Sequence, residues 1–226
     1  MPEAEKKSEV KLGLKVDVIK EKEIKHILLP GEVGAVLELT VTDKDGKVTD
    51  HRVLKSKSFV RQFLELLWIQ SFQIPEVAPY NMRDTANTLQ DICESGLTFA
   101  SNGASGIITH GIVVGTGAVA PTIDDYALGT IILHDDAPPT AGRLQYSAVT
   151  FGAPASDATT SQFTITRDFA NASGASITVN EIGLYVKGYL YNVTYYFMTI
   201  RDVISGGIAV PNGQTLTVNY RPQAVI

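Results

Sequence analysis

The sequence predicts a mainly β fold, an antiparallel β-sandwich or a jelly-roll-like barrel with one N-terminal amphipathic helix and a flexible N-terminus. From residue 107 onward, apolar and β-branched runs alternate with short segments rich in Gly, Pro, Asn and Ser. Short strands joined by such turns are typical of sandwiches and barrels. One segment, residues 57–72, instead repeats its apolar side chains at helical spacing. Hydrophobic residues make up 44% of the chain and charged residues 19%, as in ordinary globular proteins.

The N-terminal region is predicted to contain a tail, a strand and a hairpin. Residues 1–9 are mostly polar and charged, and we expect a flexible tail there. Residues 33–55 predict a β-hairpin, because apolar residues alternate with polar ones on both sides of the turn sequence DKDG, in which Gly46 is free to take positive φ. Between them, residues 10–20 predict a half-buried strand of period two. Its apolar face consists of Leu12, Leu14, Val16 and Val18.

The segment 57–72 is the predicted helix. Phe59, Phe63 and Leu66 recur at three- and four-residue spacing, and Pro75 ends any continuation. A second apolar stripe consists of Val60, Leu64 and Trp68. A helix that is apolar on two sides packs between a sheet and a further layer. That layer is supplied either by this chain or by a neighbouring subunit.

Residues 75–106 are predicted to form a long loop region with a short strand or two, and loops of this length often serve assembly or binding. The sandwich is predicted over residues 107–226, and residues 10–74 are either part of the same domain or a preceding strand-and-helix unit. The predicted strands of the sandwich cover residues 106–115, 129–135, 142–151, 161–171, 175–186, 189–203 and 214–226.

Charge and cysteine content exclude several classes of protein. The net charge of -5 argues against a nucleic-acid-binding protein, which normally carries a basic face. The single cysteine, Cys93, excludes an intrachain disulfide and a cysteine-based zinc site, and we expect it to be a small buried residue. The N-terminus has no signal-peptide pattern, and no apolar run is long enough to cross a bilayer. We therefore expect synthesis in a cytoplasm and no membrane partner.

One motif suggests a dinucleotide-binding turn. Gly115, Gly117 and Ala120 spell G-x-G-x-x-A after an apolar run, and the acidic pair Asp135–Asp136 follows about 20 residues later. Such a turn must open a helix that crosses back over a parallel sheet. Here Pro121 follows at once, and strand-like residues resume soon afterwards. We interpret the two glycines as a structural turn between strands and expect no cofactor.

Metal-binding and catalytic patterns are weak. Two groups of side chains could hold a metal: His110, His134, Asp135 and Asp136 for a transition metal, or Asp124 with Asp125 for a hard cation. Paired acids in turns are usually solvated or capping, so we expect no metal. The histidines are scattered, and G-x-S-x-G is absent from the sequence. A triad or a carboxylate pair that assembles only in space stays open, but we expect no enzyme.

Tyrosines cluster in residues 185–197, which predict a hairpin turning at Lys187–Gly188. Tyr189, Tyr191 and Tyr195 are expected to share one face. We favour aromatic packing in the core and between subunits, while a sugar- or protein-binding face is the alternative.

Several residues of the predicted sandwich have evident structural uses. Glu181 lies in a mostly apolar strand and needs a partner if it points inward, which Arg167 or Arg201 could supply. Gly183 lets a backbone or an aromatic ring come close. Residues 171–174 fit a tight hairpin turn, and the sequence VPNG separates the last two strands.

Three segments, VGTGAVAPTIDDYALGTII, FTITRDFANASGASITVNEIGLYV and MTIRDVISGGIAVPNGQTLTVNYR, resemble segments of virion structural proteins of tailed bacteriophages and related prophages. The motifs occur in the same order and cover residues 107–220. The helix sequence SKSFVRQFLELLW is also similar to the N-terminal part of those proteins. The resemblance implies a β-rich virion component without a catalytic site.

We therefore expect a structural component of a tailed-phage virion, located in the particle as a capsid-decoration, neck or tail protein. It is expected to form a homo-oligomer and to assemble with other virion proteins, without nucleic acid, membrane or small-molecule ligand. A receptor- or carbohydrate-binding module at the tail tip is the alternative, and a hydrolase with an unrecognised site is a third hypothesis. The candidate subunit contacts are Phe59, Phe63, Trp68, Tyr189, Tyr191 and Tyr195.

Overall fold

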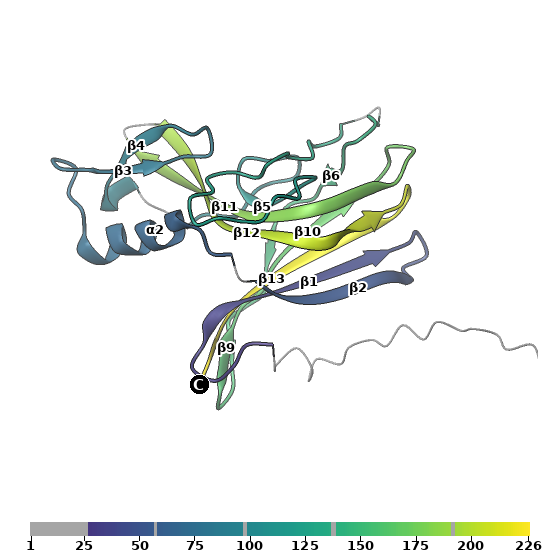
Figure 1. The fold of residues 1–226 in the computed structure, drawn as a ribbon, viewed down its shortest axis with the longest axis horizontal. Coiled ribbons are helices and arrows are strands. Elements are labelled where there is room, and N and C mark those ends of the chain that lie inside the picture. Colours follow the sequence, from purple (N-terminus) through teal and green to yellow (C-terminus); the bar gives the residue numbers. More distant parts are fainter. Residues whose placement is uncertain (1–26, 57, 97–98, 137–138, 191–192) are drawn as a thin grey trace, which may run out of the picture.

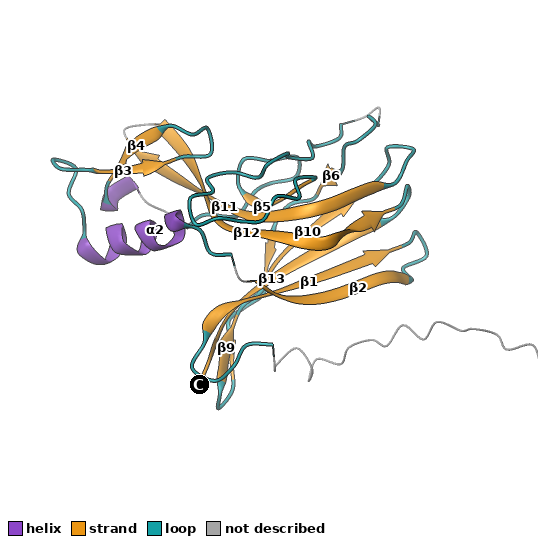
Figure 2. Ribbon diagram, in the orientation of Figure 1, coloured by secondary structure: helices purple, strands orange, loops and turns teal. Residues whose placement is uncertain are grey.

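The computed structural model describes residues 27–56, 58–96, 99–136, 139–190 and 193–226. The predicted tail at 1–9, the predicted strand at 10–20 and Tyr191 lie outside these residues. The described chain is mainly β and its paired strands are antiparallel (Figure 2). Two sheets face each other and form a sandwich, and a small lobe with the long helix lies at one end (Figure 1).

The larger sheet contains eight strands, five of which follow one path. Along this path the order is β2 (Val48–Ser56), β1 (Val33–Thr42), β13 (Thr215–Val225), β10 (Ile165–Ala170) and β6 (Gln145–Tyr146). Three short strands attach to it: β7 (Thr150–Phe151) pairs with β10, β9 (Thr160–Gln162) pairs with β13, and β8 (Ala155–Ser156) pairs with β9.

The smaller sheet contains three strands in the order β12 (Val193–Val210), β11 (Ile177–Leu190) and β5 (Gly111–Gly115). The main core lies between the two sheets. It joins Leu37, Leu39 and Val41 of β1 with residues of β13, β10 and all three strands of the smaller sheet. The alternation read from the sequence of β1 is confirmed, because all three side chains have no exposed surface.

The hairpin predicted over residues 33–55 is confirmed as β1 and β2. Gly46 takes φ +77° in the turn, as expected. The Asp43 carboxylate accepts hydrogen bonds from the backbone N–H groups of Asp45 at 3.0 Å and Lys47 at 2.9 Å. The turn is thus closed by its own acidic side chain, as Asp does in such turns.

The helix α2, Arg61–Phe72, lies within the range 57–72 and begins four residues later. Phe59 bridges to Ile200 of β12, and the Val60 N–H donates to the Thr199 carbonyl. This strand-like pairing fixes an extended backbone, so the helix begins only after Val60.

Residues 75–106 contain more regular structure than a long loop. They include β3 (Tyr80–Arg83), β4 (Leu89–Ile92) and the short helix η1 (Glu94–Gly96). The β3–β4 hairpin and α2 enclose a second core with β11 and β12, which we call the α2 lobe. Its buried members are Leu66, Ile69, Ile74, Met82, Ile92, Cys93, Val186 and Phe197. Cys93 is fully buried, as predicted.

Five details of the predicted sandwich are wrong. The strand predicted over residues 142–151 is interrupted at residues 147–149, so only the short strands β6 and β7 form there. β11 runs through Lys187–Gly188 to Leu190 instead of turning there, because its pairing with β12 continues without a break. Residues 204–207 are predicted to lie between two strands, but they form a bulge inside β12 opposite Asn180, where Gly206 and Gly207 take positive φ. Residues 129–135 make only isolated bridges. Residues 171–174 cross from β10 in one sheet to β11 in the other, so they are no hairpin turn. The VPNG turn between β12 and β13 is confirmed.

At one end the larger sheet extends beyond the smaller one as a projecting arm, made of residues 33–35, 155–162 and 222–226. The last residues of β13 pair with both β9 and the start of β1 there. Figure 1 shows β9 and the C-terminus at the tip of this arm. Leu28 packs on Val36 and Val225, so the chain that leads into β1 lies against the arm.

Candidate functional site

Glu181 is a fully buried carboxylate in β11, held by the loop that carries the G-x-G-x-x-A sequence. Its Oε1 accepts hydrogen bonds from the backbone N–H groups of Gly117 and Thr130, both at 2.9 Å, and its Oε2 accepts one from Gly129 at 3.1 Å. β5 ends at Gly115, which pairs with Glu181 in the sheet, so the loop leaves the sheet beside this carboxylate. Backbone N–H groups arranged in this way bind anions, and the anion here is the protein's own side chain.

The two motif glycines are required by this close approach. A Cβ at Gly117 would overlap the Glu181 carboxylate, and a Cβ at Gly115 would lie 2.7 Å from Glu181 Oε1. Neither glycine takes a positive φ. The two glycines lie where a strand ends and a loop begins, as predicted. They are required there because a larger residue would overlap the Glu181 carboxylate, and not because the backbone takes a positive φ.

Arg201, on β12, completes the site. Its Nε and Nη2 donate to Glu181 Oε2 at 3.0 and 2.9 Å, and its Nη1 donates to Asp125 Oδ2 at 2.6 Å. Burial opposes ionisation of Asp125, but hydrogen bonds from Thr122 and Arg201 outweigh it and lower the pKa of Asp125. Burial likewise disfavours the Arg201 cation, and its bonds to Asp125 and Glu181 raise its pKa in spite of that. Of the two predicted partners for Glu181, Arg201 is therefore the one that binds it.

Arg167 of β10 has a different role. It is fully buried and lies over the Tyr146 ring, 4.8 Å from the centroid. Burial lowers the pKa of Arg167 to about 10, which still leaves it charged at neutral pH. Its guanidinium donates to the backbone carbonyls of Ala104, Ile107, His110, Ile112 and Ser147. Arg167 thus ties β10 to β5 and to the loops on either side.

The region that resembled a dinucleotide-binding turn therefore has its anion-binding groups already occupied. The N–H groups that would face a phosphate bond to Glu181, and a phosphate would meet the negative charge of that carboxylate. The arrangement fixes the loop that follows β5 against β11.

The residues weighed as metal ligands have other partners. Asp124 pairs with Arg61 at the start of α2, and Asp125 pairs with Arg201. His134 Nδ1 accepts a hydrogen bond from the Tyr146 N–H at 3.0 Å, and its Nε2 lies 3.3 Å from Asp136 Oδ1. In the described part of the chain, three or more His, Cys, Asp or Glu side chains do not come together in an arrangement that could hold a metal.

His110 and Asp135 are the other two candidates from this group. His110 stacks on Tyr196, with ring centroids 5.9 Å apart. Burial, followed by the charges of Lys187 and Arg167, lowers its pKa. Asp135 accepts a hydrogen bond from the Thr140 N–H at 2.7 Å through Oδ1, while its buried Oδ2 has no hydrogen-bond partner among the described residues.

The tyrosines named for subunit contact or binding divide among different environments. Tyr189 is 52% exposed, and Tyr195 is half-buried against the core of the α2 lobe. Tyr185 is buried, and its hydroxyl accepts a hydrogen bond from the Leu128 N–H at 2.7 Å. Its ring lies against Gly183, where a Cβ would come within 2.9 Å of the ring. The prediction that Gly183 lets an aromatic ring come close is therefore confirmed.

The outer face of α2 is the most apolar exposed surface on the helix. Leu64 is 63% exposed, Leu67 43%, Trp68 47% and Phe72 66%. Trp68 stacks on Phe72 with centroids 5.6 Å apart and meets Tyr80 edge-on. The second apolar stripe read from the sequence is thus divided: Val60 is buried before the helix begins, whereas Leu64 and Trp68 are partly exposed on the outer face of α2.

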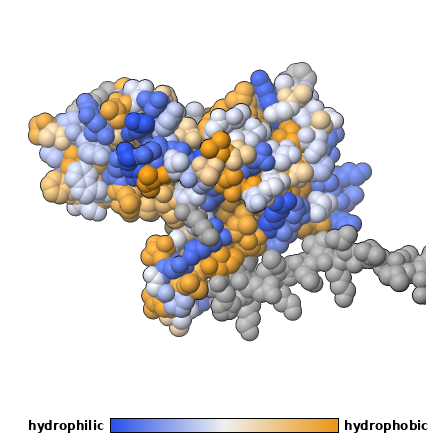
Figure 3. Space-filling view, in the orientation of Figure 1, coloured by the Kyte–Doolittle hydropathy of each residue, from blue (hydrophilic) through white to orange (hydrophobic). Residues whose placement is uncertain are grey.

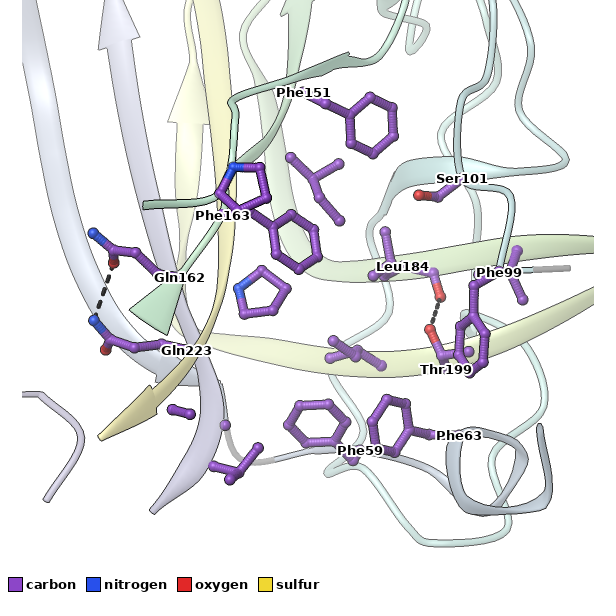
Figure 4. A pocket seen from close by; sticks show the side chains of 18 of the residues that line it. Phe59, Phe63, Phe99, Ser101, Phe151, Gln162, Phe163, Leu184, Thr199 and Gln223 are labelled. Carbon is purple, nitrogen blue, oxygen red and sulfur yellow. Dashed lines mark hydrogen bonds between the residues drawn. The ribbon is translucent and has the colours of Figure 1, made fainter. Parts of the chain in front are cut away.

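A second apolar surface is a cleft of about 440 Å³ between the arm, the smaller sheet and the start of α2. Figure 3 shows apolar residues on both sides of the hollow between the α2 lobe and the arm. Five phenylalanines line this surface, which we call the phenylalanine cleft: Phe59, Phe63, Phe99, Phe151 and Phe163 (Figure 4).

The sequence pointed to only two of these five residues. Phe59 and Phe63 belong to the apolar repeat of the predicted helix and are candidate subunit contacts, and their ring centroids lie 4.6 Å apart. Phe99, Phe151 and Phe163 lie in three separate segments outside the helical repeat, and no sequence pattern marks them as parts of one surface. All three are partly exposed, so they belong to a surface and not to the sandwich core.

Comparison with known proteins assigns no family. No protein-family model matches the chain, and no curated protein and no solved structure matches it either. In the described residues, no helix has both the length and the apolar character that crossing a bilayer requires.

Proposed function

We propose that this chain is a structural subunit of a tailed-phage virion, which assembles with copies of itself and with other capsid, neck or tail proteins. The observation that carries the proposal is the outer face of α2, where Leu64, Leu67, Trp68 and Phe72 are all exposed. Contiguous exposed apolar surface of this kind marks protein–protein interaction sites. Aromatic residues are also enriched at the centres of such interfaces.

The internal charges support a structural role. Glu181, Arg201 and Asp125 satisfy one another, and Arg167 is bound by backbone carbonyls. These contacts connect strands and loops that are far apart in the sequence, which suits a rigid subunit. The ordered resemblance of residues 107–220 to virion structural proteins of tailed phages gives the proposal its biological setting.

The alternative, a receptor- or carbohydrate-binding module at the tail tip, has less support. It relies on the tyrosine face expected from Tyr189, Tyr191 and Tyr195, but Tyr195 packs on the α2 lobe. Tyr189 is 52% exposed, and Tyr191 lies outside the described residues. Of the described tyrosines on this face, one is therefore largely open to a ligand.

Mass spectrometry of purified particles tests the virion role. Particles from the native host are banded on a density gradient, digested and searched for peptides of this chain. We expect its peptides to band with capsid or tail proteins. Their recovery only from the soluble fraction would contradict the proposal.

A pair of variants links this result to α2. Trp68→Glu places a charge on the outer face of the helix, and we expect the variant to be missing from particles. Val77→Glu is the matched control, because Val77 is 93% exposed and lies in the loop after the helix. Equal incorporation of both variants would show that the α2 face is not the assembly surface.

A further inference from the structure

The phenylalanine cleft is an apolar concavity that stays open to water. Phe99, Phe151 and Phe163 are 42%, 49% and 38% exposed, and the described residues that line the cleft include none with a charge. Exposing so much aromatic surface is unfavourable, and covering it is favourable in proportion to the area removed from water. An apolar occupant would therefore bind favourably in the cleft.

The polar groups at the cleft are poorly placed to orient a small molecule. Gln223 Nε2 donates to Gln162 Oε1 at 3.0 Å, and both side chains point away from the phenylalanines (Figure 4). Thr199 Oγ1 donates to the Leu184 carbonyl at 2.9 Å. Pockets for small ligands usually combine apolar walls with a few polar groups that fix the ligand's orientation. An occupant that brings apolar side chains on its own backbone fits this surface better.

We propose that the occupant is residues 10–20 of this chain, which lie outside the described residues. Their sequence alternates apolar and polar residues, with Leu12, Leu14, Val16 and Val18 on one side and Lys11, Lys15 and Asp17 on the other. An extended segment of period two presents one apolar row and one charged row. It would bury the apolar row against the phenylalanines and leave the charged row in water, as a half-open cleft requires.

The position of Leu28, near the start of the described chain, lets residues 10–20 reach the phenylalanine cleft. Leu28 packs on Val36 and lies against Gly34 on the outer face of β1, and Val33 and Gly34 also line the cleft on the inner side, so the chain before Leu28 can reach the cleft around the end of β1. The eight residues 19–26 span at most about 27 Å when fully extended. The segment can therefore fill the cleft of its own subunit or that of an adjacent copy. The inference holds whether or not the chain is a virion protein.

Photo-crosslinking on the full-length chain tests the occupant. Benzoyl-phenylalanine replaces Phe163 in one sample and Phe99 in another, and crosslinked peptides are identified by mass spectrometry after irradiation. We expect crosslinks to residues 10–20. The control carries the same probe at Val77, and no crosslink to residues 10–20 is expected there. Mixing copies labelled with ¹⁴N and ¹⁵N shows whether the segment comes from the same subunit or from another.

Crosslinks to another segment, such as the β8–β9 hairpin of a second copy, would overturn the inference. So would the absence of any peptide crosslink from both positions. Neither result would bear on the presence of the chain in particles, so the two proposals can fail separately.

A matched pair of substitutions tests the predicted orientation of the segment. Leu14→Asp removes an apolar residue from the side that faces the cleft, and Lys15→Asp changes the adjacent residue on the opposite side. We expect Leu14→Asp to bind more of a dye specific for exposed apolar surface, and Lys15→Asp to bind as much as the unchanged protein. Equal dye binding by the two variants would overturn the proposal.

Discussion

Arg201 holds Glu181 through two hydrogen bonds, from Nε at 3.0 Å and from Nη2 at 2.9 Å, at a position where the glutamate has no exposed surface. The remaining hydrogen bonds to the carboxylate come from the backbone of the glycine loop. A sequence that resembles a phosphate-binding turn thus binds an anion, but the anion belongs to β11. The pair thus joins β11 to β12 within the smaller sheet and holds the glycine loop against both strands.

Removing the charge of Glu181 should strongly destabilise the fold. Glu181→Gln keeps the size of the side chain, but its amide group would face backbone donors, and Arg201 would keep only Asp125 as an acidic partner. Breaking a buried ion pair at one partner costs about 3–5 kcal/mol. Chemical denaturation measures the change in the free energy of unfolding. The control is Asp45→Asn in the exposed β1–β2 turn, for which we expect a change within about 0.5 kcal/mol.

Gly117 and Gly129 should respond differently to the same substitution. Gly117→Ala drives a methyl group into the Glu181 carboxylate, and we expect a loss of about 2–3 kcal/mol, as in overpacked sites. Gly129→Ala places its methyl group 3.6 Å from Glu181 Oε1, an ordinary contact distance, so its loss should stay below about 1 kcal/mol. Thermal unfolding of both variants compares them. Equal losses would show that the carboxylate does not set the requirement for glycine.

His110 should titrate below its ordinary value of 6.5, because burial and the positive charges of Lys187 and Arg167 disfavour its protonated form. The unfolded chain then binds this proton more readily than the folded protein does. The contribution of His110 to stability is therefore present above pH 6.5 and is lost as the pH falls through the pKa of the folded state. An NMR titration of the imidazole Cε1–H signal measures this pKa, and a value of 6.5 or higher would contradict the prediction.

Two leucines of α2 should separate stability from association. Leu66 is fully buried, and Leu66→Ala should cost about 2–5 kcal/mol of unfolding free energy. Leu64, two residues earlier, is 63% exposed, and Leu64→Ala should change that free energy by less than about 1 kcal/mol. If the outer face is an interface, Leu64→Ala will weaken self-association although the fold is intact. A large stability loss in Leu64→Ala would mean that this face is covered within the subunit.

The fold was more predictable from the sequence than the surfaces were. Alternation in residues 37–41 and the turn at Gly46 are local signals, and both predicted the β1–β2 hairpin correctly. Pairing between segments that are far apart in the sequence produces a weaker pattern in the sequence itself. The extension of β11 past Gly188 depends on its pairing with β12, which overrides the local turn preference of Lys187–Gly188.

The buried charges were predictable only in part. Glu181 in an apolar strand indicated a partner, and Arg201 was one of the two candidates. The choice between Arg201 and Arg167 depends on which strands are neighbours, and β12 pairs directly with β11 whereas β10 belongs to the other sheet. The phenylalanine cleft gave almost no sequence signal, because Phe99, Phe151 and Phe163 come from separate segments that only the fold brings together.

The mass of the full-length chain in solution tests the central claim, that this is an assembling structural subunit, most directly. Size-exclusion chromatography with light scattering at micromolar concentration should give a multiple of the 24.4 kDa subunit mass. A variant that carries Leu64→Glu and Trp68→Glu should give 24.4 kDa, with its unfolding transition retained. An unchanged chain that remains a stable 24.4 kDa monomer under these conditions would contradict the claim.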